Sequence, residues 1–335
     1  MSVDHELADM MDAVFANHRE KHPTGPAVDR DLWQHLDELG LVRLTGAEQL
    51  GGSGAGWYEA AELLSATVRH GIRIPLAEHD LLACWLLDVT GLPSDGALRT
   101  VCMLDKTGRA TAVPWAATVD RVVLVWRADG QHRVADVAAG ELDITPGNNL
   151  IGEPRDTVTA DLVGLQSAPA ALALIDQLRL KSGLVRAIQV CAALDRIVQL
   201  CIEHVGSRIQ FGRPLSKFQA VQHLVSDIAA EAALARAATE AALSAGVTHQ
   251  WSADHLKFLV AVARSCAGHA ASIVVRNAHQ VHGAIGTTRE HRLHEFSRAA
   301  LAWRSEFGSM RYWDDQVTDA ALYASAGGLW GLISG

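Results

Sequence analysis

The chain has 335 residues, of which 49% are hydrophobic and 20% are charged, and its formal net charge at pH 7 is −9. This composition is typical of a globular protein with sizeable buried cores, and it excludes a disordered chain. The acidic balance argues against nucleic acid as a partner, although it leaves room for a local basic pocket that binds phosphate.

The cysteines and the N-terminal residues indicate a cellular compartment. Five scattered cysteines form no CxxC pair and no disulfide framework, which favours a reducing environment. The acidic first residues do not resemble a signal peptide, and no run of about 18 apolar residues predicts a membrane span. We therefore expect a cytoplasmic protein with no membrane partner.

Residues 1–98 are predicted to form a helical domain, because apolar residues recur at helical spacing from the N-terminus onward. Further helices are predicted at residues 31–40, 57–70 and 76–89, with Gly40 as a stop signal and Pro75 as a separator. Residues 41–44 are predicted to be extended. The glycine-rich segment 51–56 lacks the GK[ST] ending of a P-loop, so a flexible connection is favoured over a phosphate cradle.

Residues 99–167 change character and predict a small β domain. Short β-branched runs occur at residues 101–104, 122–126, 133–137 and 157–159, separated by glycine and proline. Residues 168–335 are again helical in pattern, with lengths that suit a helical bundle. The predicted fold is therefore mainly α, with a small β domain in the middle.

One stretch, RIQFGRPLSKFQAVQ at residues 208–222, interrupts two of these long helical patterns. Gly212 and Pro214 break the chain there, because glycine adopts unusual φ values and proline cannot continue a helix. The arginine, phenylalanine and glutamines of this corner could bind a planar, phosphorylated ligand. On spacing alone, an ordinary corner between two helices explains the pattern equally well.

This stretch resembles the flavin-binding corner of the acyl-CoA dehydrogenases. A second segment, QVHGAIGTTREH at residues 280–291, followed by Leu293, His294 and Arg298, resembles another motif of the same family. The resemblance implies an N-terminal helical domain, a shortened middle β domain and a C-terminal four-helix bundle. It also implies FAD as cofactor, an acyl-CoA thioester as substrate and an electron-transferring flavoprotein as the usual acceptor. The reaction it implies introduces an α,β double bond.

The resemblance assigns a cofactor role to residues of both motifs. The expected FAD contacts are Arg208 at the pyrophosphate, Gln210 and Phe211 at the adenine, Gln219 close by, and Gln280, Gly283 and Ala284 at the phosphates and ribityl chain. Ala284 stands where the family usually has glycine, and its methyl group limits a close approach. A structural alternative makes Phe211 a core residue and Gln219 a contact at a helix cap.

The catalytic carboxylate of the resembled family occupies one of two sequence positions, and neither holds an acid here. Counting from the motifs places Ser182 and Phe307 in these positions, and Glu306 lies one residue before Phe307. One residue turns a helical side chain by about 100°, so Glu306 fits the role only if the register shifts. Otherwise Glu306 is a surface residue that pairs with a neighbour such as Arg304.

The histidines at positions 279, 282, 291 and 294 raise the question of a metal. Their spacing matches neither HExxH nor HxxEH, and the family motif accounts for His282, His291 and His294 without a metal. We therefore expect no metal site.

The middle domain lacks the TEPxxGSD-like segment that approaches the flavin ring in the resembled family. Together with the base positions, this resembles one subunit of the heteromeric (α2β2) actinobacterial enzymes, which act on CoA thioesters of steroid side chains or other bulky acyl groups. The chain is then expected to share an FAD site with a paralogous subunit that carries the base. Two alternatives stay open: a complete homomeric dehydrogenase that uses Glu306, and a non-enzymatic relative that has lost FAD.

Overall fold

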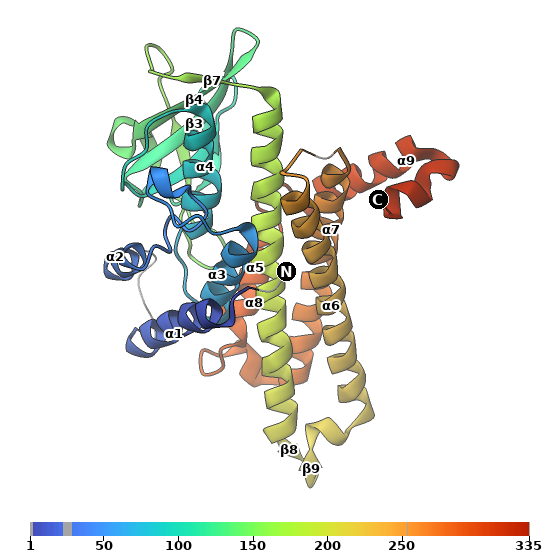
Figure 1. Cartoon of the computed structure of the whole chain (residues 1–335). Helices are drawn as coiled ribbons and strands as arrows, with labels where there is room; N and C mark the ends of the chain where they lie inside the picture. The colour runs from blue at the N-terminus through green and yellow to red at the C-terminus, as the bar shows by residue number, and fades with distance from the viewer. Residues whose placement is uncertain (1–2, 23–28, 253, 335) are drawn as a thin grey trace. The chain divides into compact units, whose positions relative to one another are not determined.

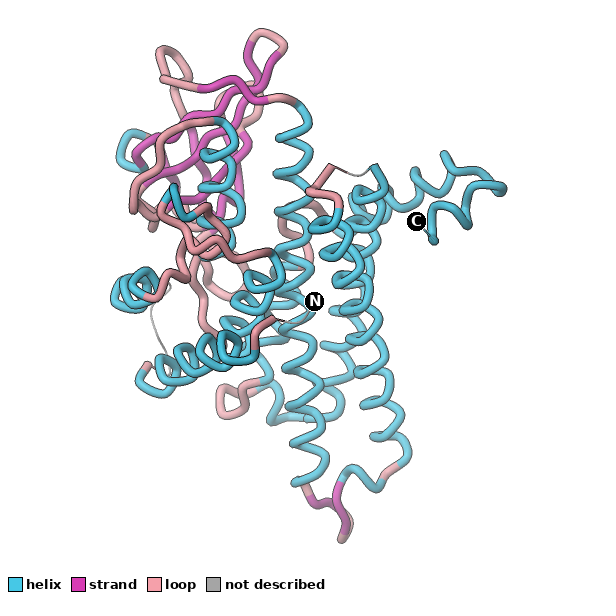
Figure 2. Tube along the Cα trace, in the orientation of Figure 1, coloured by secondary structure: helices cyan, strands magenta, loops and turns pink. Residues whose placement is uncertain are grey.

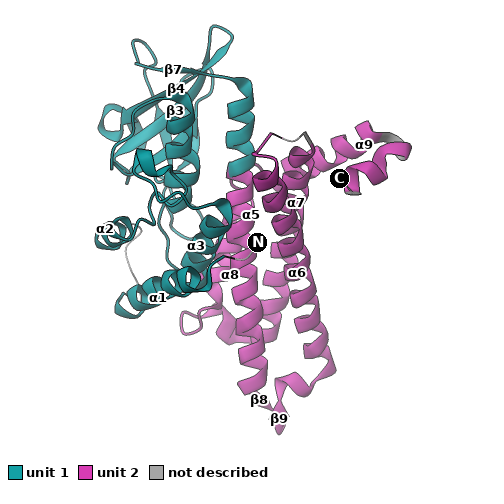
Figure 3. Cartoon of the chain, viewed as in Figure 1, with its two compact units in different colours: residues 1–181 teal, residues 182–335 magenta. Residues whose placement is uncertain are grey.

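The computed structural model of the chain describes residues 3–22, 29–252 and 254–334. Figure 1 gives the order of the elements, and Figure 2 shows that most strands gather in one region, a short hairpin lies apart from them, and helices form most of the rest. The chain divides into two compact units, residues 1–181 and 182–335 (Figure 3). The regions expected as a helical domain and a β domain thus share the first unit.

Helices form the first half of unit 1. They are α1 (His5–Lys21), α2 (Arg30–Glu38), α3 (Trp57–His70) and α4 (Trp85–Thr90), with a short 3₁₀ turn η1 at Glu48–Leu50. Acidic side chains cap the first two helices: Asp4 accepts from the backbone of Glu6, and Asp29 accepts from the backbone of Asp31 and Leu32. Residues 41–44, expected to be extended, form turns instead. Gly40 has φ of 71°, which explains why α2 ends there.

The helix predicted at residues 76–89 exists, but its first part is a π-helix, η2 (Ala77–Cys84), that continues into α4. All eight residues of η2 are buried, including Glu78, His79 and Asp80. A π-helix is uncommon, and its presence often marks a functional segment.

Two small sheets complete unit 1. The first has the order β1 (Arg99–Met103), β3 (Arg121–Ala128), β4 (Gln131–Ala138) and β7 (Ala168–Ala170). The second has the order β2 (Arg109–Pro114), β6 (Arg155–Thr159) and β5 (Asp143–Thr145), and the 3₁₀ turn η3 (Ala139–Glu141) precedes β5. Only β1 and β3 pair in parallel, and the other pairs are antiparallel.

The buried run of β3 holds the first sheet together. Val122, Val123, Leu124 and Val125 are at most 1% exposed. Asp129 and Gly130 join β3 to β4, both with positive φ, as a two-residue hairpin turn requires. The sequence predicted β1, β3, β4 and β6 but not the other strands, because these are three to six residues long and carry charged, small or proline residues.

Unit 2 consists of long helices. Helix α5 (Leu172–Ser207) begins in unit 1 and continues into unit 2, where it is followed by α6 (Gln219–Thr248), α7 (Asp254–His282), α8 (Leu293–Trp303) and α9 (Met310–Ser334). Short elements connect them: strands β8 (Ile209–Gln210) and β9 (Arg213–Pro214), and 3₁₀ turns η4 (Leu215–Lys217) and η5 (Gly283–Thr287). Helix α7 packs along α6 and also contacts α8 and α9.

Helix α7 also bears on the membrane question. By length and composition, the segment His255–Thr287 could cross a membrane, contrary to the sequence expectation. However, 56% of its apolar window is buried inside the protein, where it packs against the neighbouring helices. A core helix passes the same test, so the segment is weak support for a membrane span.

The cysteines are all free, and four of them are buried. Cys84 and Cys102 lie in unit 1, whereas Cys191 and Cys201 lie on the part of α5 that belongs to unit 2. Burial raises the pKa of Cys84 to about 11 and that of the other three to about 12. These thiols therefore stay protonated at neutral pH.

Candidate cofactor-binding site

The corner between α5 and α6 is a small hairpin. Strands β8 and β9 pair Ile209 with Pro214 and Gln210 with Arg213, which leaves Phe211 and Gly212 as the turn. Both turn residues have positive φ, 52° for Phe211 and 78° for Gly212. This conformation is unusual for a bulky side chain. Because local strain of this kind often accompanies function, the hairpin is a candidate binding element.

The aromatic residue of this hairpin projects into solvent. Phe211 is 91% exposed, which excludes the alternative that made it a core residue. Its ring lies edge-on to Phe218 at 6.2 Å between centroids, and the guanidinium of Arg213 lies 4.2 Å from the Phe218 ring. A flat apolar surface flanked by a cation suits a planar, electron-rich ring such as a purine.

Gln219 is the exposed first residue of α6, and no side chain caps this helix. The first amide groups of an uncapped helix are free to donate, and the helix dipole favours a negative group there. The role of Gln219 as a cap contact therefore finds no support in the hydrogen bonds of α6.

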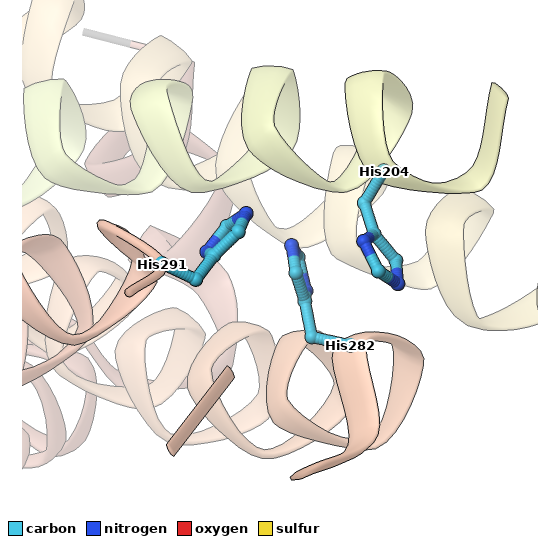
Figure 4. A group of neighbouring side chains, drawn as sticks. All are labelled: His204, His282 and His291. Carbon is cyan, nitrogen blue, oxygen red and sulfur yellow. The ribbon is translucent and has the colours of Figure 1, made fainter. Parts of the chain in front are cut away.

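Three histidines connect the corner with the second motif (Figure 4). His204 lies one turn before Arg208 on α5, His282 ends α7, and His291 lies in the loop before α8. The ring centroids of His204 and His282 are 4.5 Å apart and nearly parallel, and those of His282 and His291 are also 4.5 Å apart. We call these residues the histidine stack. It joins the end of α5, which Arg208 follows, to the end of α7, which Gly283 follows.

The histidine stack is neutral at physiological pH. Burial lowers the pKa of His204 to about 4, assisted by the other two rings and by the positive charge of Arg208. Burial likewise lowers the pKa of His282 and His291. A lowered pKa disfavours protonated rings beside Arg208, whose exposed guanidinium can donate to a phosphate.

Backbone groups of two helices hold the His282 ring. Its Nδ1 lies 2.8 Å from the carbonyl oxygen of Ala278, which can only accept, so Nδ1 carries the proton. A backbone hydrogen bond with Leu200 of α5 also acts on the ring, and both bonds oppose the effect of burial on the pKa of His282. The ring is therefore fixed between α7 and α5, where it positions the histidine stack.

The loop after α7 exposes its backbone. Gly283 has φ of 63°, and a Cβ added there would meet no atom within 4 Å. Gly286 differs, because a Cβ there would lie 2.8 Å from Cβ of His282 and 3.1 Å from the Leu293 side chain. Only glycine fits at position 286, because the loop there packs closely against His282. At Gly283, by contrast, the backbone of the loop is open to solvent.

The residues expected to contact FAD are all exposed and all belong to unit 2, namely Arg208, Gln210, Phe211, Gln219, Gln280, Gly283 and Ala284. The charge of Arg208 acts on His204, whose ring stacks on His282, the residue that lies within the second motif. Among the described residues, no hydrogen bond or ring contact joins Gln210 or Phe211 to that segment. Sequence reasoning missed His204, although its position four residues before Arg208 on a helix was a usable signal.

Neither of the two positions expected for the catalytic base holds an acidic residue. Ser182 is buried on α5. Phe307 lies in the turn between α8 and α9 with φ of 52°, and the guanidinium of Arg186 lies 4.9 Å from its ring. Neither side chain can remove a proton from carbon.

Glu306 is held by a buried arginine rather than by Arg304. Nε of Arg186 donates to Oε2 of Glu306 at 2.8 Å, and the Arg186 side chain is only 1% exposed. Arg304 instead donates to the hydroxyl of Ser272. A carboxylate that neutralises a buried cation is less available as a proton acceptor.

A second buried arginine fixes the backbone of the same turn. Nη2 of Arg264 donates to the carbonyl oxygens of Arg304 and Glu306 at 3.0 and 2.8 Å. Burial lowers the pKa of Arg264 to about 9, to which the nearby charge of Arg186 contributes. Arg186 thus binds the carboxylate of Glu306 while Arg264 binds its backbone carbonyl, which indicates a structural role for this glutamate.

Unit 1 contains a separate titratable pair that sequence reasoning did not find. The Lys181 ammonium lies 3.9 Å from the Trp85 ring centroid and 5.2 Å from that of Trp57, and the residue is 3% exposed. Burial lowers the pKa of Lys181 to about 7 and raises that of Asp80, in η2, to about 6. The two indole faces favour the charged amine, so they oppose the effect of burial.

The chain is similar in sequence to proteins of a known family. Residues 2–93 match the family model of the acyl-CoA dehydrogenase N-terminal domain, and residues 179–319 match that of the C-terminal domain. Acyl-CoA dehydrogenase IpdE2 of Mycobacterium tuberculosis is 29% identical over 276 residues, which cover 81% of this chain and 80% of the relative.

Two solved structures share the fold. A chain of the ChsE4-ChsE5 complex from Mycobacterium tuberculosis aligns with a TM-score of 0.83 at 22% identity, over 95% of this chain and 97% of that one. A chain of the Tcur3481-Tcur3483 steroid ACAD (G363A variant) aligns with a TM-score of 0.83 at 20% identity, over 96% and 98%.

Proposed function

Because this chain belongs to the acyl-CoA dehydrogenase family, we propose that it is one subunit of an FAD-dependent enzyme that introduces an α,β double bond into an acyl-CoA thioester. In this proposal the chain contributes the corner and the histidine stack to an FAD site shared with a paralogous subunit. The partner supplies the catalytic base and the acyl pocket, in an α2β2 assembly.

The observation that carries the proposal is a contrast within unit 2. The cofactor residues are exposed, and a Cβ at Gly283 would meet no atom within 4 Å, so the backbone there is open to a ligand. In contrast, the base positions hold Ser182 and Phe307. The chain therefore has the features of a binding half without those of a catalytic half.

The residues fit FAD by the chemistry of their donors and acceptors. Arg208 would hold the pyrophosphate, Phe211 with Gln210 would line the adenine, and Gln219 would donate nearby. Gln280, Gly283 and the backbone of Ala284 would line the ribityl chain and phosphates. FAD, once bound, accepts the hydride, whereas this chain orients the cofactor and screens its phosphates from water.

The names of the relatives suggest a substrate class. One structural neighbour is described as a steroid ACAD, and another is a complex of two different chains. We include a CoA thioester of a steroid side chain as the proposed substrate, and an electron-transferring flavoprotein as the proposed acceptor.

The test is flavin content and native mass of the chain expressed alone and together with a paralogous dehydrogenase subunit. We expect the chain alone to be colourless and the pair to be a yellow heterotetramer that oxidises acyl-CoA. Arg208→Ala should remove flavin from the pair, whereas Glu306→Gln should leave the turnover of the folded pair in place. A yellow homotetramer that is active alone would establish the alternative in which Glu306 is the base. A pair that carries no flavin at all would establish the non-enzymatic alternative.

A further inference from the structure

The end of α1 and the start of α2 bring together three potential metal ligands, which we call the α1–α2 cluster: His18, His22 and Asp29. His18 lies in the last turn of α1 and His22 is its C-cap, and their two rings are in contact. Asp29 is the N-cap of α2. The family motifs described above do not include these residues.

The distances in the cluster approach those of a coordination sphere. Nε2 of His18 and Oδ2 of Asp29 are 3.5 Å apart, and the ring centroids of His18 and His22 are 4.6 Å apart. One ligand atom from each residue lies within 4.8 Å of the other two. Around tetrahedral zinc, with bonds of about 2.0–2.1 Å, ligand atoms lie about 3.3 Å apart. A small rotation of His22, which is exposed, would close the remaining gap.

The two carboxylate oxygens of Asp29 have different partners, and this arrangement favours metal binding. Its Oδ1 accepts from the backbone of Asp31 at 3.0 Å and of Leu32 at 3.1 Å, as a helix cap does. Its Oδ2 faces His18 and is the oxygen left to serve as a ligand. The cap thereby fixes the direction of the carboxylate, as supporting hydrogen bonds do in metal sites.

The chemistry of the ligands also favours a cation. The His18 side chain is only 13% exposed, and its Nε2 faces Oδ2 of Asp29. Asp29 contributes the one negative charge of the cluster. Two imidazoles and a carboxylate are a ligand set that suits zinc and other borderline divalent ions.

A cavity of about 430 Å³ adjoins the cluster. Its lining includes all three residues of the cluster together with Asn17, Asp31 and His35. The space leaves room for a water molecule or an additional ligand at the open coordination positions.

Among the described residues, the histidine stack also brings together ligand atoms of three residues, but it suits a cation less well. None of its three members is a carboxylate, and the rings of His204 and His282 are nearly parallel instead of converging on a point. From this contrast we infer that the α1–α2 cluster binds a zinc-class divalent cation, which ties the end of α1 to the start of α2.

The experiment is a zinc titration of the tag-free, EDTA-treated full chain at pH 7.5 by calorimetry, with Co²⁺ absorption as a report on ligand geometry. We expect one zinc per chain, and binding at least about tenfold weaker in His18→Ala and in Asp29→Asn. Asn also caps helices, so Asp29→Asn removes the ligand charge while α2 keeps its cap. Zinc should raise the melting temperature of the wild type but not that of these variants.

Two matched controls sharpen the test. His5 pairs with Asp9 on the same helix, with both side chains largely exposed, and His5→Ala should bind zinc as the wild type does. His204→Gln should also leave zinc binding unchanged. The inference is overturned if zinc does not bind at micromolar concentrations, if Asp29→Asn and His18→Ala bind as tightly as the wild type, or if only His204→Gln loses the ion. None of these outcomes depends on whether the chain binds FAD.

Discussion

Replacing Glu306 by glutamine separates a structural role of this residue from a catalytic one. The carboxylate accepts a 2.8 Å hydrogen bond from Arg186, whose side chain is 1% exposed, while that of Glu306 is 14% exposed. Removing one partner of a buried pair costs about 3–5 kcal/mol, because the other charge stays buried without compensation. Glutamine keeps an oxygen facing Arg186, so we expect the lower end, about 3 kcal/mol.

The assay is thermal unfolding of the wild type and the variant, followed by circular dichroism. A loss of about 3 kcal/mol corresponds to a fall of about 6–12 °C in melting temperature for a unit of this size. Glu240→Gln is the matched control, because Glu240 lies 3.9 Å from Arg236 with both side chains more than half exposed, and we expect no measurable change. Changing Arg186 to Met together with Glu306→Gln should recover part of the loss, since both charges of the pair are then gone.

The reasoning would be refuted by an unchanged melting temperature in Glu306→Gln together with abolished turnover of the flavin-loaded enzyme. That result would make Glu306 the base and reduce its contact with Arg186 to a minor one.

The remaining predictions concern pH and packing. The pKa of His204 is lowered from 6.5 to about 4, so the unfolded chain binds more protons than the folded chain between these pH values. The free energy of unfolding of the wild type should therefore fall by about 1–2 kcal/mol between pH 6.5 and 4. Chemical denaturation should show a smaller fall in His204→Gln. The pKa of Lys181 is lowered from 10.5 to about 7, so the unfolded chain binds more protons than the folded chain between these pH values. The stability of the wild type should therefore rise from pH 7 to 10. Melting curves of Lys181→Met should lack this rise. A wild type with flat stability over that range would show that the indoles retain the ammonium ion. Gly286→Ala should lower the free energy of unfolding by about 1–3 kcal/mol, because the new Cβ would lie 2.8 Å from Cβ of His282. Gly206→Ala is the control: it lies in open space within a helix and should raise the free energy of unfolding by about 0.5–1 kcal/mol. Equal unfolding midpoints of the two variants would contradict this reasoning.

The sequence predicted the helices of unit 2 well, because their apolar residues repeat with a helical period over many turns. It predicted β3 and β4 for a similar reason, since β-branched runs flank an Asp-Gly turn. It missed the π-helix η2, because periodicity alone does not distinguish a π-helix from an α-helix within one or two turns.

The candidate site shows a different limit. Local motifs identified Arg208, Phe211 and Gly283, because these residues lie in short, recognisable segments. Arg186 and Glu306 are 120 positions apart, and their pairing depends on how α5 packs against the turn after α8. Such distant contacts come from tertiary packing, so a single sequence offers only a hint, namely an arginine within an otherwise apolar helical face.

The buried cysteines have a practical consequence. Each unit carries two thiols that are shielded from solvent and protonated at neutral pH, Cys84 with Cys102 in one and Cys191 with Cys201 in the other. Since only the thiolate reacts quickly, an alkylating reagent should modify these positions only when their unit opens. Peptide mass mapping after timed alkylation would then follow the opening of each unit separately. The native chain thus contains built-in reporters of whether its two halves unfold together or one before the other.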